Sequence, residues 1–446
     1  MSALNITHDP ARRSWIESAN AGDTDFPIQN LPFGAFTRGG DTRTGVAIGD
    51  RVVDLRALHD LALLDGDAAL ACASACDSTL NALMALDVRH VSALRAALSD
   101  LLKHDAPARS RLVSSIDAVL PRVADVELTL PCAIGDYTDF LTSLHHTERH
   151  GRYKGLADPL PVAFKSLPIA YHGRASSLRV SGGDVRRPHG QFRDADGNVR
   201  FGPAPMLDFE LELAAVIGRG NALTRPISID DARHHVFGYC LLNDWSAKSI
   251  QWFEQVLGPF LGKSFHSSVS PWLVTEEALV PFRQAAPSRA AGDPAILPHL
   301  HGTHDQQHGG LSLDLYAHLS TAAMRSDRVP AMQITHTQPD NLYWTFAQMI
   351  AHHTSNGCNL RTGDLLGSGT ISGASDASRA CLTELSEAGK KPLALPTGET
   401  RIALEDGDEI VLSARASAPG AVSIGFGECR GRIAAALPYP HATGEH

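Results

Sequence analysis

Three acidic residues alternate with apolar ones in the stretch 207–213, LDFELEL. This two-residue period predicts a strand that carries Asp208, Glu210 and Glu212 on one face. Carboxylates so close together repel one another, and their burial is costly unless a cation or a proton intervenes. Two interpretations are therefore open: an acidic strand face in water, or part of a cation site.

Two further acids, Asp139 and Asp244, stand in polar stretches of otherwise apolar or turn-rich sequence. Asp244 directly follows a strand-like run, and loop positions of this kind often carry ligating residues. Together with Glu210 and Glu212 they would make an all-oxygen ligand set, which suits Mg²⁺ or Ca²⁺ better than Zn²⁺. The sequence predicts the members of this set but not their convergence.

Other motifs in the chain carry less weight. His146 and His150 are four residues apart and could bind zinc on a helix face, but the H-E-x-x-H base is missing and no third nitrogen or sulfur ligand is indicated. The stretch 258–264 resembles a phosphate loop, yet its first glycine is one residue too close to Lys263. Neither zinc nor nucleotide binding is predicted from these motifs.

The composition bounds the class of protein. The chain has 446 residues, a hydrophobic content of 43%, a charged content of 20% and a net charge of −10, which together indicate a globular, two-domain protein. The negative charge and the absence of a dense Lys/Arg run argue against nucleic-acid partners. No run of about 20 apolar residues predicts a membrane span, and no signal peptide is predicted. Seven scattered cysteines without a C-x-x-C pair indicate reduced thiols, and hence a cytoplasmic protein.

The elements that must position these residues are predicted from periodicity and turn chemistry. The patterns favour a domain at 1–128 with a hairpin and a helix, and a mostly β domain at 129–446 with no βαβ rhythm. Residues 283–310, rich in Ala, Pro, Gly and His, are predicted to be a surface insertion. The predicted elements are a hairpin of 46–48 with 52–55, a helix over 91–102, strands at 178–180 and 207–216, a helix over 343–353, and a hairpin of 401–404 with 409–412.

Taken in order, the polar stretches resemble the fumarylacetoacetase (fumarylacetoacetate hydrolase) family over almost the whole chain. The resemblance implies a mainly β, α+β fold: a small N-terminal SH3-like β-barrel and a larger C-terminal mixed β-sandwich roll, as a homodimer. The stretches that carry it are 25–34, 45–50, 136–140, 171–177, 207–213, 243–247, 258–265, 356–360, 363–366 and 368–373.

The resemblance also implies the activity: metal-dependent hydrolysis of a C–C bond in a 1,3-diketo acid, 4-fumarylacetoacetate giving fumarate and acetoacetate, the last step of tyrosine (and phenylalanine) catabolism through homogentisate. His146 matches the general base and Glu384 its partner, and Ca²⁺ or Mg²⁺ is the implied cofactor. The residues at the family's metal positions are Asp139, Glu210, Glu212 and Asp244, with Lys263 and Ser267. Gln251, Lys263 and Lys248 stand at the positions of the oxyanion and leaving-group contacts. Tyr171 and Thr370 stand at substrate-binding positions.

Departures from the family pattern fall close to this chemistry. Leu141 stands where the family has a substrate-binding Tyr, and Lys154 and Lys248 stand where it has Arg. Lysine lacks the rigid two-pronged fork of arginine, so neither replacement is neutral at a carboxylate or oxyanion site. Two alternatives follow: a hydrolase of another acylpyruvate or β-diketone acid, and a metal-binding protein without catalysis. A superfamily isomerase or decarboxylase is disfavoured, because it has little use for His146 with Glu384. Asp208 is not a family ligand, and we predict that it supports a neighbouring loop or cation.

Overall fold

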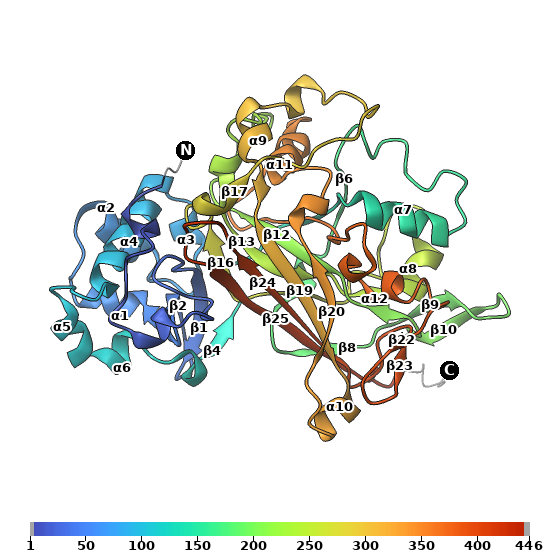
Figure 1. Cartoon of the computed structure of the whole chain (residues 1–446), viewed down its shortest axis with the longest axis horizontal. Coiled ribbons are helices and arrows are strands. Elements are labelled where there is room, and N and C mark those ends of the chain that lie inside the picture. The colour runs from blue at the N-terminus through green and yellow to red at the C-terminus, as the bar shows by residue number, and fades with distance from the viewer. Residues whose placement is uncertain (1–3, 441–446) are drawn as a thin grey trace, which may run out of the picture.

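The first strands in the chain form an antiparallel unit of three, β1 (Phe33–Arg38), β2 (Asp41–Ile48) and β3 (Arg51–Asp54), drawn in blue in Figure 1. The computed structural model describes residues 4–440. Gly49 forms the turn between β2 and β3 with φ at 55°, a left-handed conformation that glycine adopts without a side-chain clash. The predicted hairpin at this position is confirmed.

Six helices follow these strands and cover one side of the N-terminal part (Figure 1). Leu94, Leu98 and Leu102 are buried along one face of the longest helix, at the spacing that places side chains above one another. The helix predicted over 91–102 is thereby confirmed, with its start a little earlier. The six helices are α1 (Leu55–Asp60), α2 (Gly66–Ser74), α3 (Asn81–Met84), α4 (Val88–Leu102), α5 (Arg109–Ser114) and α6 (Ile116–Val119).

The N-terminal strands belong to a 12-stranded sheet that runs through the molecule. Its other strands are β4 (Glu127–Thr129), β5 (Tyr137–Leu141), β6 (Ile169–His172), β7 (Leu178–Val180), β12 (Leu211–Ile217), β13 (Val236–Asn243), β15 (Ser267–Val269), β16 (Trp272–Thr275) and β21 (Leu365–Gly367). The main path is β3-β2-β1-β16-β13-β12-β21-β5-β6, and most of its pairs are antiparallel. On β1, Gly34 faces Trp272, and a Cβ there would lie 2.5 Å from the indole.

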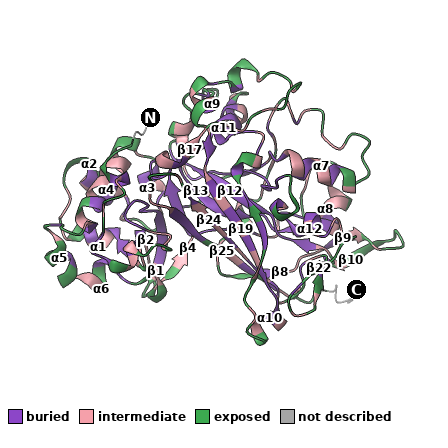
Figure 2. Cartoon of the chain, viewed as in Figure 1, coloured by how far each residue is buried: buried purple, intermediate pink, exposed green. Residues whose placement is uncertain are grey.

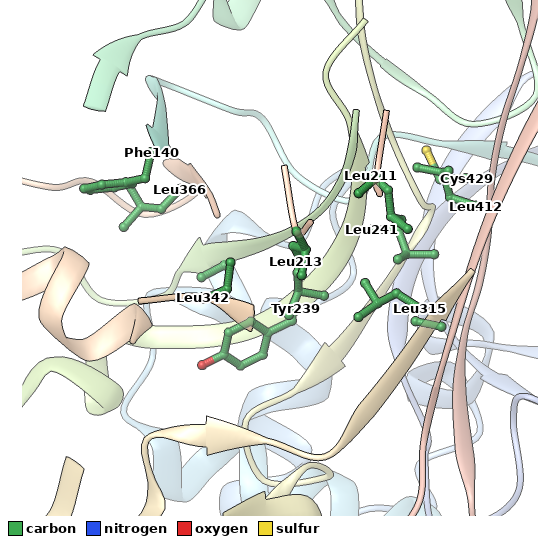
Figure 3. Packing of buried hydrophobic residues seen from close by; sticks show 14 of the residues in the cluster. Phe140, Leu211, Leu213, Tyr239, Leu241, Leu315, Leu342, Leu366, Leu412 and Cys429 are labelled. Atoms are coloured by element: carbon green, nitrogen blue, oxygen red, sulfur yellow. The ribbon is translucent and has the colours of Figure 1, made fainter. Parts of the chain in front are cut away.

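A second sheet of five strands packs across the first. Its order is β20 (Met332–Thr337), β19 (Leu313–Ser320), β24 (Glu409–Ala416), β25 (Ile424–Ala434), β8 (Asp184–Arg186). Buried and half-buried residues alternate along β24, so one face of this sheet is turned to the core. Figure 3 shows Leu213 and Leu241 of the first sheet beside Leu315 of the second, all within one apolar cluster.

Shorter elements complete the larger part of the chain. Figure 2 shows that β12 and β13 are buried along their length, whereas the surrounding helices and loops are exposed on one side. The helix predicted over 343–353 is confirmed as α11, which Thr345 caps. The shorter elements are α7 (Leu144–Tyr153), α8 (Lys248–Glu254), α9 (Thr303–His308), α10 (Ala322–Ser326), α11 (Phe346–Thr354) and α12 (Leu382–Leu385), with the strand pairs β9 (His189–Arg193) and β10 (Val199–Pro203), β11 (Leu207–Asp208) and β14 (Ser246–Ala247), β17 (Arg283–Gln284) and β18 (Gly310–Leu311), and β22 (Leu393–Ala394) and β23 (Thr400–Arg401).

The architecture is a mixed α/β, sheet-rich fold, as the resemblance implied at the coarse level. The finer expectation of an SH3-like barrel is not confirmed, because no sheet closes on itself within residues 4–440. Instead β1 continues through β16 into the large sheet. Within the same residues, no helix combines the length and apolar character that a membrane crossing requires.

Two local predictions are wrong. The stretch 401–404 does not pair with 409–412, since β23 pairs with β22 and β24 pairs with β19 and β25. Leu404 bonds instead to Leu207, so a distant partner replaces the local one. Residues 283–310 are not merely a surface insertion, because Leu300 is fully buried and Asp305 accepts a hydrogen bond from Thr345.

Candidate active site

The acidic stretch 207–213 does not form one continuous strand. β11 ends at Asp208, β12 begins at Leu211, and Phe209 and Glu210 lie outside both ladders. The three carboxylates are all buried, with exposed fractions of 2%, 5% and 0% for Asp208, Glu210 and Glu212. The break sends them to different partners, so the predicted single acidic face divides into three contacts with separate roles.

Glu212 joins two acids from neighbouring strands in a buried cluster. Asp139 is on β5, Asp244 follows β13, and one oxygen from each of the three carboxylates lies within 4.8 Å of the others. Burial, followed by the repulsion of Asp244, raises the pKa of Asp139 well above its usual range. Burial, followed by Asp139 and Asp244, does the same for the pKa of Glu212. The cluster is therefore short of positive charge.

The cluster fits a hard divalent cation. Asp139 Oδ1 and Glu212 Oε1 are buried without a hydrogen-bond partner, which leaves their lone pairs free for a cation. Gly367, on the strand between β5 and β12, keeps the space open: a Cβ at this position would lie 2.5 Å from Asp139 Oδ1 and 3.1 Å from Glu212 Oε2. An all-oxygen donor set of this kind is one that Mg²⁺ and Ca²⁺ prefer.

Glu210 faces two lysines rather than the three-carboxylate cluster. The ammonium of Lys248 donates to Glu210 Oε1, and Lys263 Nζ lies 2.6 Å from Oε2. Burial alone would raise the pKa of Glu210, but these two ammonium groups outweigh it and hold the pKa well below its usual range. Glu210 is thus a carboxylate whose charge is matched by lysines.

Lys263 connects Glu210 to the cluster. Its Nζ lies 2.5 Å from Asp244 Oδ2, and Ser267 Oγ donates to Asp244 Oδ1 at 2.8 Å. Burial would lower the pKa of Lys263, but Asp244 and Glu210 outweigh it and raise the pKa. A protonated ammonium has no lone pair for a cation, so Lys263 contributes charge at this position and does not ligate.

His146 and Glu384 meet across two helices, as the resemblance implied they would. His146 is on α7, Glu384 is on α12, and His146 Nδ1 lies 3.1 Å from Glu384 Oε2. Arg149 Nη1 donates to the other carboxylate oxygen at 3.1 Å, and Ser372 donates to Oε2. Burial would raise the pKa of Glu384, but His146 outweighs it and the pKa is lowered. The ionised Glu384 can hold His146 in one orientation, with Nε2 free to take a proton.

Asp208 supports the helix that carries Glu384. Its carboxylate accepts the N–H groups of Leu382 at 2.6 Å and Thr383 at 2.8 Å, which are unpaired donors at the start of α12. The contact agrees with the prediction of a supporting role for Asp208.

Removing this support is expected to damage both stability and geometry. We expect Asp208→Ala to lower the free energy of unfolding by about 2–4 kcal/mol, because the buried N–H groups of Phe209, Leu382 and Thr383 lose their acceptor. Urea unfolding followed by circular dichroism measures this change. Asp208→Asn is the matched control, because its amide oxygen keeps one acceptor and should cost about half as much. Equal stability of Asp208→Ala and wild type would show that α12 does not depend on this carboxylate.

These groups meet at a cavity of about 590 Å³. Gln251 extends from α8 to its wall, and Gln251 Oε1 is buried without a partner. Tyr171 lies between Asp139 and Asp244, with its hydroxyl 3.0 Å and 2.6 Å from their carboxylates. The predicted site residues on the wall are Asp139, Leu141, His146, Lys154, Tyr171, Glu210, Glu212, Lys248, Gln251, Lys263 and Thr370. Asp244 and Glu384 are not on the wall but contact Tyr171 and His146, which are, and Ser267 lies behind Asp244.

Sequence reasoning missed three residues of this site: His150 on the cavity wall, and Arg149 and Cys381 beside Glu384. Arg149 bonds Glu384, and Cys381 lies beside it, 3.4 Å from Sγ to Oε2. The sequence indicates His150 only as half of a zinc pair, because its neighbour Cys381 is 231 positions away in the chain. Arg149 and His150 follow His146 by three and four residues, a spacing that places their side chains near His146 on the helix. This spacing is the signal by which the sequence could have indicated them.

A buried oxygen cluster beside a hydrogen-bonded His–Glu pair, opening on one cavity, is the arrangement of a hydrolytic enzyme. Two family models match the chain. The model of the fumarylacetoacetase N-terminal domain matches residues 29–131, and the model of the fumarylacetoacetate (FAA) hydrolase C-terminal domain matches residues 137–434. Curated fumarylacetoacetases are similar over nearly their whole length. The protein from Oryza sativa subsp. japonica is 42% identical, covering 96% of this chain and 98% of its own. The proteins from Bos taurus and Homo sapiens are 41% and 40% identical, each covering 94% of this chain and 98% of its own. The chain belongs to the fumarylacetoacetase family.

Proposed function

We propose that this chain is a hydrolase acting on a C–C bond, which converts 4-fumarylacetoacetate and water to fumarate and acetoacetate. The observation that carries the proposal is the similarity to curated fumarylacetoacetases at about 40–42% identity over nearly the full chain. The meeting of His146, Glu384 and the carboxylate cluster at one cavity supports it. The alternative of a different acylpyruvate or β-diketone substrate is not favoured.

In the proposed mechanism, His146 removes a proton from water while Glu384 holds the imidazolium that forms. The hydroxide adds to a carbonyl carbon of the diketone, and Gln251, Lys248 and Lys263 stabilise the alkoxide. The C–C bond then breaks, its electron pair leaves as the enolate of acetoacetate, and a proton returns to that carbon. A divalent cation bound at the carboxylates would supply Lewis-acid polarisation of the diketone oxygens.

We propose Asp139, Glu212 and Asp244 as the residues that would hold this cation, with Glu210 contributing charge from its place beside Lys248 and Lys263. The oxygen donors favour Ca²⁺ or Mg²⁺. Ser267 supports Asp244 through its hydrogen bond, and Lys263 offsets the charge of the same carboxylate. This proposed ligand set leaves out Glu210, Lys263 and Ser267, which the resemblance also implied for the metal.

Tyr171, Thr370, Lys154 and Leu141 are proposed to contact the substrate, since all four lie on the cavity wall. The remaining expectations of the resemblance are likewise proposals: a division into residues 1–128 and 129–446, a C-terminal β-sandwich roll, an SH3-like N-terminal arrangement, a homodimer, a cytoplasmic location and a role in tyrosine and phenylalanine catabolism through homogentisate. The terminal residues 1–3 and 441–446 of the proposed domains lie outside the described residues.

Substrate preference tests the proposed activity. We expect kcat/KM for fumarylacetoacetate to exceed that for a simple acylpyruvate by roughly 10²-fold, because only the longer substrate has a second carboxylate for Lys154 to bind. Loss of the enedione absorbance follows the first reaction, and product analysis follows the second. Lys154→Met should lower the ratio of kcat/KM for fumarylacetoacetate to kcat/KM for the acylpyruvate, mainly through a higher KM for fumarylacetoacetate. A clear preference of the wild type for the acylpyruvate would reject the proposed substrate.

A further inference from the structure

We propose a second metal site, for a borderline-soft divalent ion such as Zn²⁺, formed by His146, His150, Cys381 and Glu384. One ligand atom from each of the four residues lies within 4.8 Å of the others. All four are buried, and the two histidines reach the wall of the 590 Å³ cavity. The site is distinct from the carboxylate cluster, with which it shares no residue.

Three separations between the donor atoms are close to those around zinc, and the other three are within 4.8 Å. Zn–N and Zn–O bonds of about 2.0–2.1 Å and Zn–S bonds of about 2.3 Å place the ligands of a tetrahedral site about 3.3–3.8 Å apart. His146 Nδ1 lies 3.1 Å from Glu384 Oε2, Cys381 Sγ lies 3.4 Å from the same oxygen, and Cys381 Sγ lies 3.8 Å from His150 Nε2. Little movement is needed to enclose an ion.

Two short helices present these ligands in pairs. His146 and His150 are one turn apart on α7, and their rings lie 4.2 Å apart between centroids. Cys381 is the residue before α12 and Glu384 is on its first turn. Because Asp208 fixes the start of α12 through two N–H groups, the cysteine and the carboxylate are held in place before any ion arrives.

Ligand chemistry separates this site from the carboxylate cluster. Two imidazoles, a thiolate and one carboxylate select zinc or cobalt, whereas Ca²⁺ and Mg²⁺ prefer oxygen donors only. Binding would release the thiol proton of Cys381 to solvent, while neutral His146 would ligate through Nδ1 with its one proton on Nε2. The resulting thiolate and carboxylate match the charge of a divalent ion, and Arg149 keeps its contact with the outer oxygen of Glu384.

Occupancy of this site would remove His146 from catalysis. An ion bound at His146 and Glu384 breaks the contact that orients the imidazole, so zinc would inhibit hydrolysis while Mg²⁺ or Ca²⁺ remains at the carboxylates. This consequence rests on the proposed function, whereas the metal site itself does not.

Cobalt is the probe for the site, because a Co²⁺–thiolate bond gives a charge-transfer absorption that oxygen ligands do not. Full-length protein saturated with Mg²⁺ is titrated with Co²⁺, and we expect one equivalent to produce this band and Zn²⁺ to displace it. Cys381→Ser should abolish the band, and Cys358→Ser, which lies outside the cluster, should retain it. His150→Gln should weaken Zn²⁺ binding at least about tenfold in competition with a chromophoric chelator.

Two results would overturn the proposal: no thiolate band in the wild-type protein, or a band that persists in Cys381→Ser. If a variant fails to fold, X-ray absorption at the zinc edge of the wild-type protein tests the site directly. A first coordination shell of zinc without sulfur would reject the proposed site. Failure of the proposed activity would leave the cobalt spectrum unchanged. Zinc inhibition without the thiolate band would place the zinc elsewhere and reject this site alone.

Discussion

Replacing His146 by glutamine is expected to lower kcat for fumarylacetoacetate hydrolysis by roughly 10²–10⁴-fold, the usual contribution of a general base. Glutamine keeps a polar side chain of similar size beside Glu384 but cannot accept the proton of water. Steady-state kinetics that follow loss of the enedione absorbance measure the effect. Glu384→Gln should cost less, because the imidazole remains and only its orientation and charge partner are lost.

His145 provides the matched control on the same helix. It is the adjacent histidine but does not line the cavity, so His145→Gln should change kcat by less than about threefold if only His146 acts as the base. Thermal unfolding of both variants checks that the fold is intact. Equal losses in the two variants, or full activity in His146→Gln, would reject His146 as the general base. Absence of turnover in the wild-type protein itself would favour a metal-binding protein without catalysis.

Removal of the divalent cation is expected to abolish turnover and to lower Tm by several degrees. A ligand at 100 times its Kd stabilises a fold by about 2.7 kcal/mol, and that contribution is lost with the ion. In the cation-free protein the carboxylates of Asp139, Glu212 and Asp244 face one another, and the ammonium of Lys263 contacts only Asp244 among them. Chelation followed by calorimetry, with Ca²⁺ or Mg²⁺ added back, measures the change.

For Glu212→Gln we expect the change in the free energy of unfolding to have opposite signs in the cation-free and the cation-bound protein. The variant should be more stable than the wild type without the cation, because one of three repelling carboxylates is gone, and less stable with it, because a ligand is gone. The hydrogen bond from the Gly369 N–H can be retained by the amide oxygen. Glu210→Gln is the control: it should destabilise both states, because Lys248 is left buried without its partner. A shift of the same sign for Glu212→Gln in both states would exclude it as a ligand.

The sequence predicts the local elements of this fold better than their pairing. The hairpin of β2 and β3 and helix α4 follow from turn chemistry and periodicity over a few residues. The hairpin predicted at 401–412 fails, although Gly407 adopts a positive φ, because Leu404 bonds to Leu207. Nothing in the local pattern encodes a partner almost 200 positions away, and long-range pairing of this kind decides where β-rich segments lie.

The site was predicted mainly through the family resemblance, with residue patterns adding part of it. Periodicity placed Glu210 and Glu212 on one face but did not predict the break at 209–210 that sends Glu210 to the lysines. The relation of Cys381 to His150 depends on how α7 and α12 approach each other. Such contacts follow from packing, so neither residue stands out in the sequence alone.

The pairing of β1 with β16 has a consequence for the order of events during synthesis. β4 covers β1 at Ala35–Thr37, but Phe33 and Gly34 pair with Leu273 and Trp272. At about 5–20 residues per second, the roughly 240 residues between these partners take about 12–48 s to translate. Throughout that interval the start of β1 is an open strand edge on the nascent chain, a surface that favours association with other chains. The first residues of β1 can pair only after the ribosome has synthesised the chain through β16.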